Sequence, residues 1–190
     1  MRFVFYLLMM IAVALGVGFG LSYYALTDGR LFGVAQVGPW HAWPDVGAHT
    51  PNPYTRGHLA RTAAFELGQS EGLEFTATID SDGEALTRDC AYRIDGKTPL
   101  ATFWTLVAVD EDGTNIAAPD VAPAMRSSGI ARADDGSIVI NVGTSLLPQN
   151  WLELTGEGPF KLVLTLYDTA AFSGFSSDAS MPSIIRGDCA

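Results

Sequence analysis

The apolar and polar positions of the chain divide it into one long apolar segment and a series of shorter ones. No charged residue lies between Phe3 and Thr27. This uncharged run is about 25 residues long, and a helix needs about 20 apolar residues to cross the hydrocarbon core of a membrane. The pattern predicts a transmembrane helix, and we assign residues 1–28 to an N-terminal anchor.

The alternative to an anchor is a signal peptide that is cleaved after export. The apolar region of a signal peptide usually has about 7 to 15 residues and ends in a small-x-small cleavage site. The end of this segment has no clear site of that kind, and Tyr23 and Tyr24 suit the aromatic belt at a membrane interface. An uncleaved helix is therefore favoured, and Arg2 gives it a small bias toward a cytoplasmic amino terminus.

Two glycines in the apolar segment bear on whether the anchor associates with a second copy. Gly16 and Gly20 form a small-xxx-small pair, which lets two membrane helices approach closely. The pair predicts a possible homodimer contact. Glycine is also common in single membrane helices, so a simple tether is the alternative.

A linker and one helix precede the main body of the domain. Residues 29–53 combine several prolines with a first extended segment at Val34–Trp40. From Tyr54 to Gln69, apolar residues recur at spacings of three and four, which is the period of a helix face. Pro53 suits the start of this helix. The residues of the predicted face are Leu59, Ala60, Ala63, Ala64 and Leu67.

Short apolar runs separated by Asp-Gly dipeptides fill the rest of the chain. Asp-Gly supports the positive φ angles of tight hairpins, so each dipeptide predicts a turn. The predicted strands are Leu73–Ile79, Tyr92–Ile94, Thr102–Val109, Ile130–Ala133, Ser137–Val142 and Phe160–Tyr167. The predicted turns are Asp82-Gly83, Asp95-Gly96, Asp112-Gly113 and Asp135-Gly136. The pattern predicts a mostly β fold over residues 54–190, an antiparallel β-sandwich or jelly roll with one preceding helix.

The last predicted strand has the clearest alternation. Phe160, Leu162, Leu164 and Leu166 fall on one of its faces, as in a half-buried strand. We expect these four side chains to lie in the core.

The charge balance and the cysteines narrow the range of partners and compartments. The chain has 11 Lys and Arg residues and a net charge of −10, which argues against nucleic-acid binding because that needs clustered cations. Cys90 and Cys189 belong to no CxxC motif and to no cluster with histidine. In an exported chain such a pair fits a disulfide, which would support a periplasmic domain. The alternative is two unrelated buried thiols.

The residue types that catalysis requires occur without a complete motif. His41, His49 and His58 all lie upstream of the predicted strands, and no G-x-S-x-G elbow accompanies the serines. The histidines have no helix-spaced pair and no nearby cysteine, so solvated loop residues are a simpler interpretation than a metal site. We predict no catalytic residue, no metal and no cofactor.

Three acidic clusters suggest calcium as an alternative to that prediction. They lie at residues 80–83, 110–113 and 134–136, and hard cations prefer several carboxylate oxygens. None of them completes the spacing of an EF-hand. Turn formation explains all three without an ion.

Four aromatic or amide residues and one arginine are the candidate contacts for a ligand or partner. Trp40 and Trp43 lie in a proline-bounded segment, where exposed tryptophans would grip a sugar or a partner side chain. Their alternative role is to close one end of the sandwich. Asn150 and Trp151 form either a pocket rim or a packed turn. Arg126 either binds a carboxylate or phosphate in bidentate fashion or is a solvated side chain.

Several spaced motifs in the second half of the chain carry a resemblance to a known family. They are Asp135-Gly136-Ser137-Ile138, Gln149-Asn150-Trp151-Leu152, the strand from Gly158 to Tyr167, Thr102–Thr105 and Pro182–Ile185. The set resembles the bacterial domain of unknown function 1214 family, and the upstream helix resembles its short, membrane-anchored branch. The resemblance implies a jelly-roll-like β domain. It also implies a companion domain, the domain of unknown function 1254, which is fused or encoded nearby.

We expect this chain to depart from the fused form of that family by lacking the companion domain. It also has Thr165 where many relatives carry Arg, which argues against anion binding at that position. Together with the anchor, the resemblance leads to a functional expectation. The chain would be a single-pass protein of the bacterial inner membrane with its domain in the periplasm, acting as a binding or interaction module with a companion-domain protein. The alternative is a β-sandwich enzyme that acts on carbohydrate or a small polar ligand.

Overall fold

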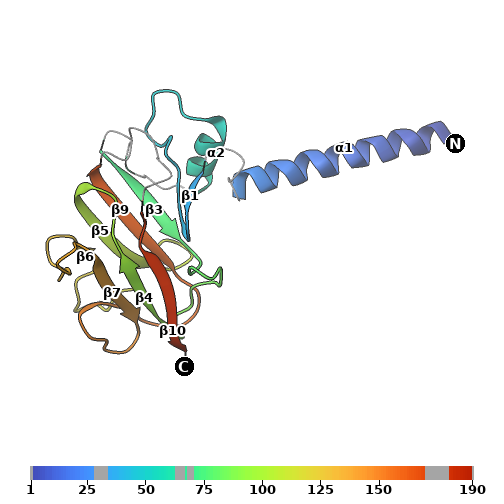
Figure 1. The fold of residues 1–190 in the computed structure, drawn as a ribbon. Helices are drawn as coiled ribbons and strands as arrows, with labels where there is room; N and C mark the ends of the chain where they lie inside the picture. Colours follow the sequence, from blue (N-terminus) through green and yellow to red (C-terminus); the bar gives the residue numbers. More distant parts are fainter. Residues whose placement is uncertain (1, 28–33, 63–66, 68–70, 170–179, 190) are drawn as a thin grey trace.

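The computed structural model describes residues 2–27, 34–62, 67, 71–169 and 180–189 of the chain (Figure 1). These residues form two helices and ten strands, and the strands make two sheets that share one core. The elements are α1 (Arg2–Thr27), β1 (Ala35–Val37), β2 (Trp40–Ala42), α2 (Pro53–Thr62), β3 (Gly72–Ala77), β4 (Cys90–Gly96), β5 (Ala101–Val109), β6 (Met125–Arg126), β7 (Ile138–Gly143), β8 (Asn150–Glu153), β9 (Lys161–Thr169) and β10 (Ser183–Cys189).

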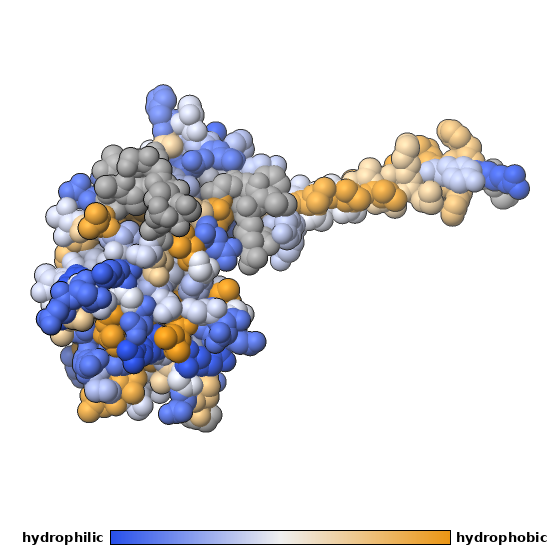
Figure 2. Space-filling view, viewed as in Figure 1, coloured by the Kyte–Doolittle hydropathy of each residue, from blue (hydrophilic) through white to orange (hydrophobic). Residues whose placement is uncertain are grey.

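Helix α1 projects away from the sheets (Figure 1). Its segment Arg2–Leu26 is long and apolar enough to cross a membrane, and the most apolar part of this segment is not buried against other described residues. Figure 2 shows hydrophobic side chains along this projecting helix. The predicted apolar helix is confirmed, and it is able to serve as a single-pass anchor.

The domain is a sandwich of a six-stranded and a four-stranded sheet. The six-stranded sheet has the order β1-β2-β3-β9-β5-β6, with antiparallel neighbours throughout. The four-stranded sheet has the order β10-β4-β7-β8. Strands that are distant in sequence are neighbours in both sheets, as β3 and β9 are, so the fold depends on long-range pairing. The predicted β-sandwich is confirmed.

One strand pair departs from the antiparallel pattern. Strands β7 and β8 are parallel, with Ile140 opposite Asn150 and Gly143 opposite Glu153. Parallel strands normally need a connection of about a dozen residues or more. Here the connection is shorter because β8 has only 4 residues, so the chain has little distance to return. Gln149, with a φ of 65°, supplies the change of direction just before β8.

The core lies between the two sheets. The side chains of Phe160, Leu162, Leu164 and Leu166 are all buried, as the alternation predicts. Residues of the opposite sheet face them, including Ile140 of β7. Burying a side chain of this size stabilises the fold by about 1.5 to 3 kcal/mol, so each residue of this layer contributes to stability.

Two predicted strand boundaries are wrong. The predicted extended segment Val34–Trp40 is a hairpin, because Gly38 takes a φ of 58° and reverses the chain between β1 and β2. The predicted strand Ile130–Ala133 is reduced to a single bridge between Arg132 and Ile138. Both errors arise because apolar runs this short do not specify how the chain pairs.

The predicted turn at Asp95-Gly96 is also wrong. Both residues belong to the end of β4, where Asp95 lies opposite Ser183 and Val139. Gly96 has a φ of 135°, and a Cβ at this position would lie 3.2 Å from the Cα of Pro182. The glycine therefore serves the close approach of two strands rather than a hairpin.

The helix and the disulfide agree with the sequence as far as the structure describes them. Helix α2 begins at Pro53 and extends to Thr62, and residues 63–66 and 68–70 of the predicted helix lie outside the described residues. Cys90 and Cys189 form a disulfide across a sequence separation of 99 residues. The predicted disulfide is confirmed, and it joins β10 to β4 near the carboxyl end of the chain.

Candidate functional site

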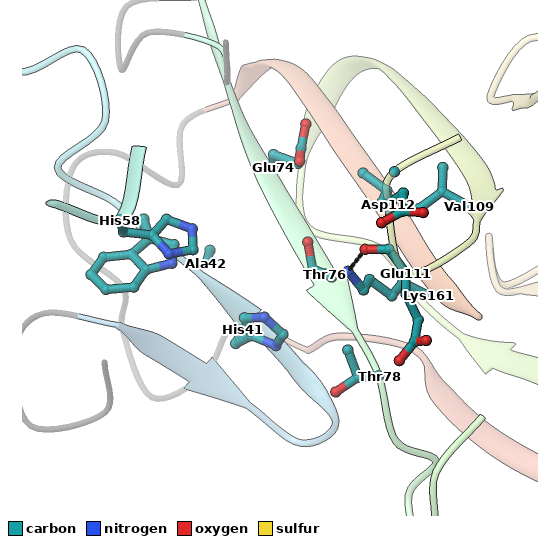
Figure 3. Close-up of a pocket in the computed structure, with 13 residues that line it drawn as sticks. His41, Ala42, His58, Glu74, Thr76, Thr78, Val109, Glu111, Asp112 and Lys161 are labelled. Atoms are coloured by element: carbon teal, nitrogen blue, oxygen red, sulfur yellow. Dashed lines mark hydrogen bonds between the residues drawn. The ribbon is translucent and has the colours of Figure 1, made fainter. Parts of the chain in front are cut away.

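A groove of about 630 Å³ lies on the outer face of the six-stranded sheet (Figure 3). Alternate residues of β3 form part of its floor, because Leu73, Phe75 and Ala77 point into the core and the residues between them point outward. These outward residues are Glu74 and Thr76, and Thr78 follows just after the strand. Lys161 and Val163 of β9 continue the floor.

One wall of the groove is built around a stacked pair of rings. Trp43, just after β2, stacks on His58 of α2 with ring centroids 4.4 Å apart and an angle of 20° between the planes. Trp43 is 5% exposed and His58 is half-buried, and both line the groove with His41 of β2. Such pairs contribute about 0.5 to 1.5 kcal/mol beyond the burial of their area. The stack therefore fixes α2 against the sheet.

The opposite wall is the acidic turn after β5. The Oδ1 atom of Asp110 accepts hydrogen bonds from the backbone N–H groups of Asp112 (3.0 Å) and Thr114 (2.8 Å), which shapes the turn. Lys161 Nζ donates to the backbone oxygen of Glu111 at 2.7 Å (Figure 3). The turn is thus tied to the floor, and the exposed carboxylates of Glu111 and Asp112 line the opening.

The chemical character of the groove is polar and mainly acidic. Glu74, Glu111 and Asp112 supply carboxylates, and Thr76 supplies a hydroxyl. The ammonium of Lys161 is already engaged with a backbone oxygen. The groove therefore offers mostly hydrogen-bond acceptors, together with two imidazoles.

Within the described residues, no group of three or more His, Cys, Asp or Glu side chains is arranged to hold a metal ion. The acidic clusters that suggested calcium instead stabilise turns. Asp80 is the clearest case, because its Oδ1 atom accepts from the N–H groups of Asp82 (3.0 Å) and Glu84 (2.9 Å). Its Oδ2 atom lies 2.9 Å from Nε of Arg186.

The third acidic turn shifts the pKa of its own carboxyl group, that of Asp135. The hydroxyl of Ser137 donates to Oδ1 of Asp135 at 2.7 Å, and the Ser137 N–H donates to the same atom at 3.0 Å. These two hydrogen bonds stabilise the charged carboxylate and lower the pKa of Asp135 below its usual value. The effect belongs to the turn, since Asp135 does not line the groove.

The structure separates the two tryptophans that the sequence placed together. Trp43 lines the groove, as described above. Trp40 is 0% exposed, and its Nε1 donates to the backbone oxygen of Pro182 at 2.7 Å. Trp40 therefore presents no ring face to a ligand.

Asn150, Trp151 and Arg126 lie away from the groove. Asn150 bridges backbone groups, accepting from Ala131 N at 2.8 Å and donating to the oxygens of Ala131 (2.9 Å) and Val139 (2.8 Å). Trp151 is half-buried, and its Nε1 donates to the oxygen of Gly143 at 3.3 Å. Arg126 is exposed at the end of β6. Through these hydrogen bonds Asn150 joins β8 to Ala131 and to β7, and Trp151 joins β8 to the end of β7.

Sequence reasoning missed the residues that form the floor of the groove. The polar positions 74, 76 and 78 alternate with buried ones, which was the available signal. That signal shows an outward face, but it does not reveal that β9 becomes the neighbour of β3. Only this pairing brings Lys161 and Val163 beside Thr76.

A second hollow of about 540 Å³ lies at the start of β5, outside the groove. Trp104 lines it and is 1% exposed, and within the described part of the chain its Nε1 has no hydrogen-bond partner. The guanidinium of Arg132 lies 5.9 Å from the centre of the Trp104 ring. Sequence reasoning did not single out either residue.

No curated protein matches the chain. Among solved structures, the VPA0106 protein from Vibrio parahaemolyticus is similar with a TM-score of 0.59 and 19% identity, over 74% of this chain and 36% of that one. An uncharacterised protein from Burkholderia cenocepacia is similar with a TM-score of 0.48 and 15% identity, over 88% of this chain and 39% of that one. The chain thus spans little more than a third of either protein, and the first similarity supports the fold alone.

The family comparison covers more than half of the chain. Residues 71–171, which include β3 through β9, match the family described as protein of unknown function (DUF1214). The matched segment contains most of both sheets and the floor of the groove. The chain belongs to the DUF1214 family.

Proposed function

We propose that the chain is a membrane-anchored binding module whose outer groove takes a small polar ligand. The observation that carries the proposal is a groove whose two walls are held by side-chain contacts. The Trp43–His58 stack fixes one wall, and the hydrogen bond from Lys161 to Glu111 fixes the other. A site that is already ordered loses little entropy on binding, so it favours recognition of a ligand.

The proposed location is the bacterial inner membrane, with the domain in the periplasm. The apolar helix α1 supports an anchor. The disulfide between Cys90 and Cys189 supports an oxidising compartment, because disulfides persist there and are rare in the cytosol.

The proposed ligand is a hydrogen-bond donor, such as a neutral polyhydroxy compound or a compound with an ammonium group. Glu74, Glu111 and Asp112 place carboxylates around the groove. These three carboxylates outnumber the single ammonium of Lys161, which donates to the backbone oxygen of Glu111, so an anionic ligand would face a net negative charge. Repulsion of this kind makes the groove selective against anions.

The groove proposal can be tested by ligand screening on the full chain in detergent micelles. Thermal shift would be measured with sugars, amino sugars, amino acids, polyamines and simple carboxylates. Thr76→Arg would fill the groove, and Thr105→Arg on the outer face of β5, outside the groove, is the matched control. We expect donor-rich compounds to stabilise the wild type and Thr105→Arg but not Thr76→Arg. Stabilisation by carboxylates alone, or by no compound, would contradict the proposal.

A companion-domain protein of the unknown function 1254 type is the proposed partner. Support comes from the family resemblance and from the length of VPA0106, of which only 36% is matched by this chain. Gentle solubilisation of native membranes and mass spectrometry of proteins bound to a carboxyl-terminal tag would test it. A stoichiometric companion is expected, with the anchor alone as the control. Recovery of the chain without that partner would contradict this part of the proposal.

An enzyme that acts on carbohydrate is a second candidate, because the groove contains several carboxylates. Glycoside hydrolysis uses a pair of carboxyl groups about 5 to 10 Å apart. Glu74→Gln and Asp112→Asn remove one charge each without a change of size. Loss of hydrolysis in both variants, with binding retained, would favour the enzyme over the binding module.

A further inference from the structure

Helix α2 packs against the last two turns of the apolar helix α1 (Figure 1). The contact is close at Gly57, where a Cβ would lie 2.7 Å from Cδ2 of Leu26. The guanidinium carbon of Arg61 lies 5.5 Å from the centre of the Tyr23 ring. The two helices thus meet through a glycine that allows close approach and through an arginine placed over a tyrosine.

The position of the contact along α1 sets its depth in a membrane. A span of the hydrocarbon core takes about 20 residues at about 1.5 Å each. Counted from Phe3, the core ends near Ser22, so Tyr23 and Tyr24 fall at the interface, where tyrosine is enriched. Because Arg61 lies over Tyr23, this placement of α1 would bring the guanidinium of Arg61 to about the depth of the lipid phosphates.

The charge of α2 is opposite to that of the chain as a whole. The helix, PYTRGHLART, contains Arg56 and Arg61 and no acidic residue, whereas the chain has a net charge of −10. Both arginines are exposed, and within the described residues no ion pair uses either guanidinium. A cation–π contact leaves the N–H donors of Arg61 available for a phosphate.

A crevice of about 520 Å³ accompanies these charges. It lies between the end of α1, at Leu21, Tyr24 and Leu26, and the start of α2, at Pro53 and Tyr54. Most of its lining side chains are apolar or aromatic. Leu21 lies at the edge of the hydrocarbon core, and Tyr24 and Leu26 lie just outside it, so the crevice fits the ester-linked end of an acyl chain.

We infer that α2 is an interfacial helix that binds an anionic phospholipid. Arg61, which lies over Tyr23, contacts the phosphate of the headgroup, and Arg56, on another face of α2, adds positive charge at the interface. The crevice between α1 and α2 receives the first part of an acyl chain. The bound lipid holds the acidic domain close to an anionic bilayer that would otherwise repel it. This inference rests on the membrane placement in the proposed function.

The test measures lipid retention by the full chain. Native mass spectrometry in detergent would compare added phosphatidylglycerol with phosphatidylcholine. The test variant is Arg56→Gln/Arg61→Gln, and the matched control is Arg93→Gln/Lys97→Gln, which removes two exposed cations elsewhere. An arginine near an anionic surface strengthens binding about fivefold. We therefore expect a phosphatidylglycerol preference of at least about fivefold in the wild type and the control, and none in the test variant.

Three outcomes would overturn the inference. They are equal retention of the two lipids by the wild type, a preference that survives Arg56→Gln/Arg61→Gln, and loss of the preference when inorganic phosphate is added at matched ionic strength. The last outcome would indicate a phosphate site without an acyl contribution. Flotation with phosphatidylcholine vesicles distinguishes failure of the lipid site on α2 from failure of the membrane anchor. A chain that does not float lacks the anchor, whereas one that floats without a lipid preference lacks only the site on α2.

Discussion

Arg186 of β10 lies with Nε 2.9 Å from Oδ2 of Asp80, whose side chain is 1% exposed. The arginine also donates from Nη2 to the oxygen of Ala85 at 2.6 Å, and its guanidinium lies 5.7 Å from the centre of the Tyr92 ring. One side chain therefore joins the end of the chain to the turn after β3 and to β4. Its contribution to stability can be measured directly.

Arg186→Met should lower the free energy of unfolding by about 2 to 4 kcal/mol, because it leaves the buried carboxylate of Asp80 without its cation. Urea denaturation of the full chain in detergent would measure the change. In Asp80→Asn, the side-chain oxygen still accepts from the turn. The double variant Asp80→Asn/Arg186→Met should therefore cost less than the sum of the two single changes. Additive losses would show that the two residues do not interact.

Replacement of both cysteines should destabilise the domain without changing its fold. The disulfide between Cys90 and Cys189 closes a loop with a sequence separation of 99 residues. In the chain-entropy model, a loop of this length contributes up to about 4 to 5 kcal/mol. We expect Cys90→Ser/Cys189→Ser to unfold at lower urea concentration, and reduced wild type to match it. A variant as stable as the oxidised wild type would contradict this expectation.

The lowered pKa of Asp135 should make a small part of the stability depend on pH. Its pKa is lower in the folded chain than its usual value of 3.8, so the stabilising effect is present above that value. The effect is lost as the pH falls through the lower folded pKa. Carboxyl-carbon NMR titration should show the pKa of Asp135 rising toward 3.8 in Ser137→Ala. An unchanged titration would mean that the Ser137 hydroxyl is not the main cause.

The stack between Trp43 and His58 should hold α2 in place. His58→Ala removes the ring, so we expect a loss of about 0.5 to 1.5 kcal/mol in the free energy of unfolding. The emission of Trp43, taken as the difference from the same chain with Trp43→Phe because the chain has four tryptophans, should shift to longer wavelength. His58→Phe keeps an aromatic ring in the stack and should retain the wild-type emission. Equal spectra for the two variants would show that stacking is not what orders this wall.

The proposed contact between two anchors can be tested with neighbouring glycines. Gly16→Ile and Gly20→Ile fill the same strip of α1, whereas Gly18→Ile places the same bulk on another side of the helix. If the anchors pair through this strip, crosslinking in membranes should fall in the first two variants and persist in Gly18→Ile. Crosslinking that is absent from the wild type, or equal in all variants, would rule out this dimer.

Local patterns were sufficient for features that depend on neighbouring residues. The apolar run identified α1, Pro53 marked the start of α2, and the period of two placed Phe160 and Leu162 in the core. The disulfide was predictable because the chain has two cysteines. The Asp-Gly rule failed at Asp95-Gly96, where pairing with β10 and β7 overrides the turn preference.

The candidate site was largely beyond sequence reasoning. Trp40 and Trp43 are close in sequence, but one is enclosed in the core and the other lines the groove, because alternation along β2 ends between them. Glu74 and Lys161 share the groove although they come from distant strands. Nothing in a local pattern specifies that β3 pairs with β9.

The sequence by itself determined the apolar helix, the β-rich class, the inward faces of the strands and the family of the chain, since each depends on short-range periodicity or on motifs in order. The tertiary structure alone decided the strand order, the parallel pair β7 and β8, and the position of α2 against α1. It also decided the groove. The physical reason is that strands distant in sequence pair because many side chains are buried together. The free energy of that burial is a sum over the whole domain, so no local pattern of residues specifies it.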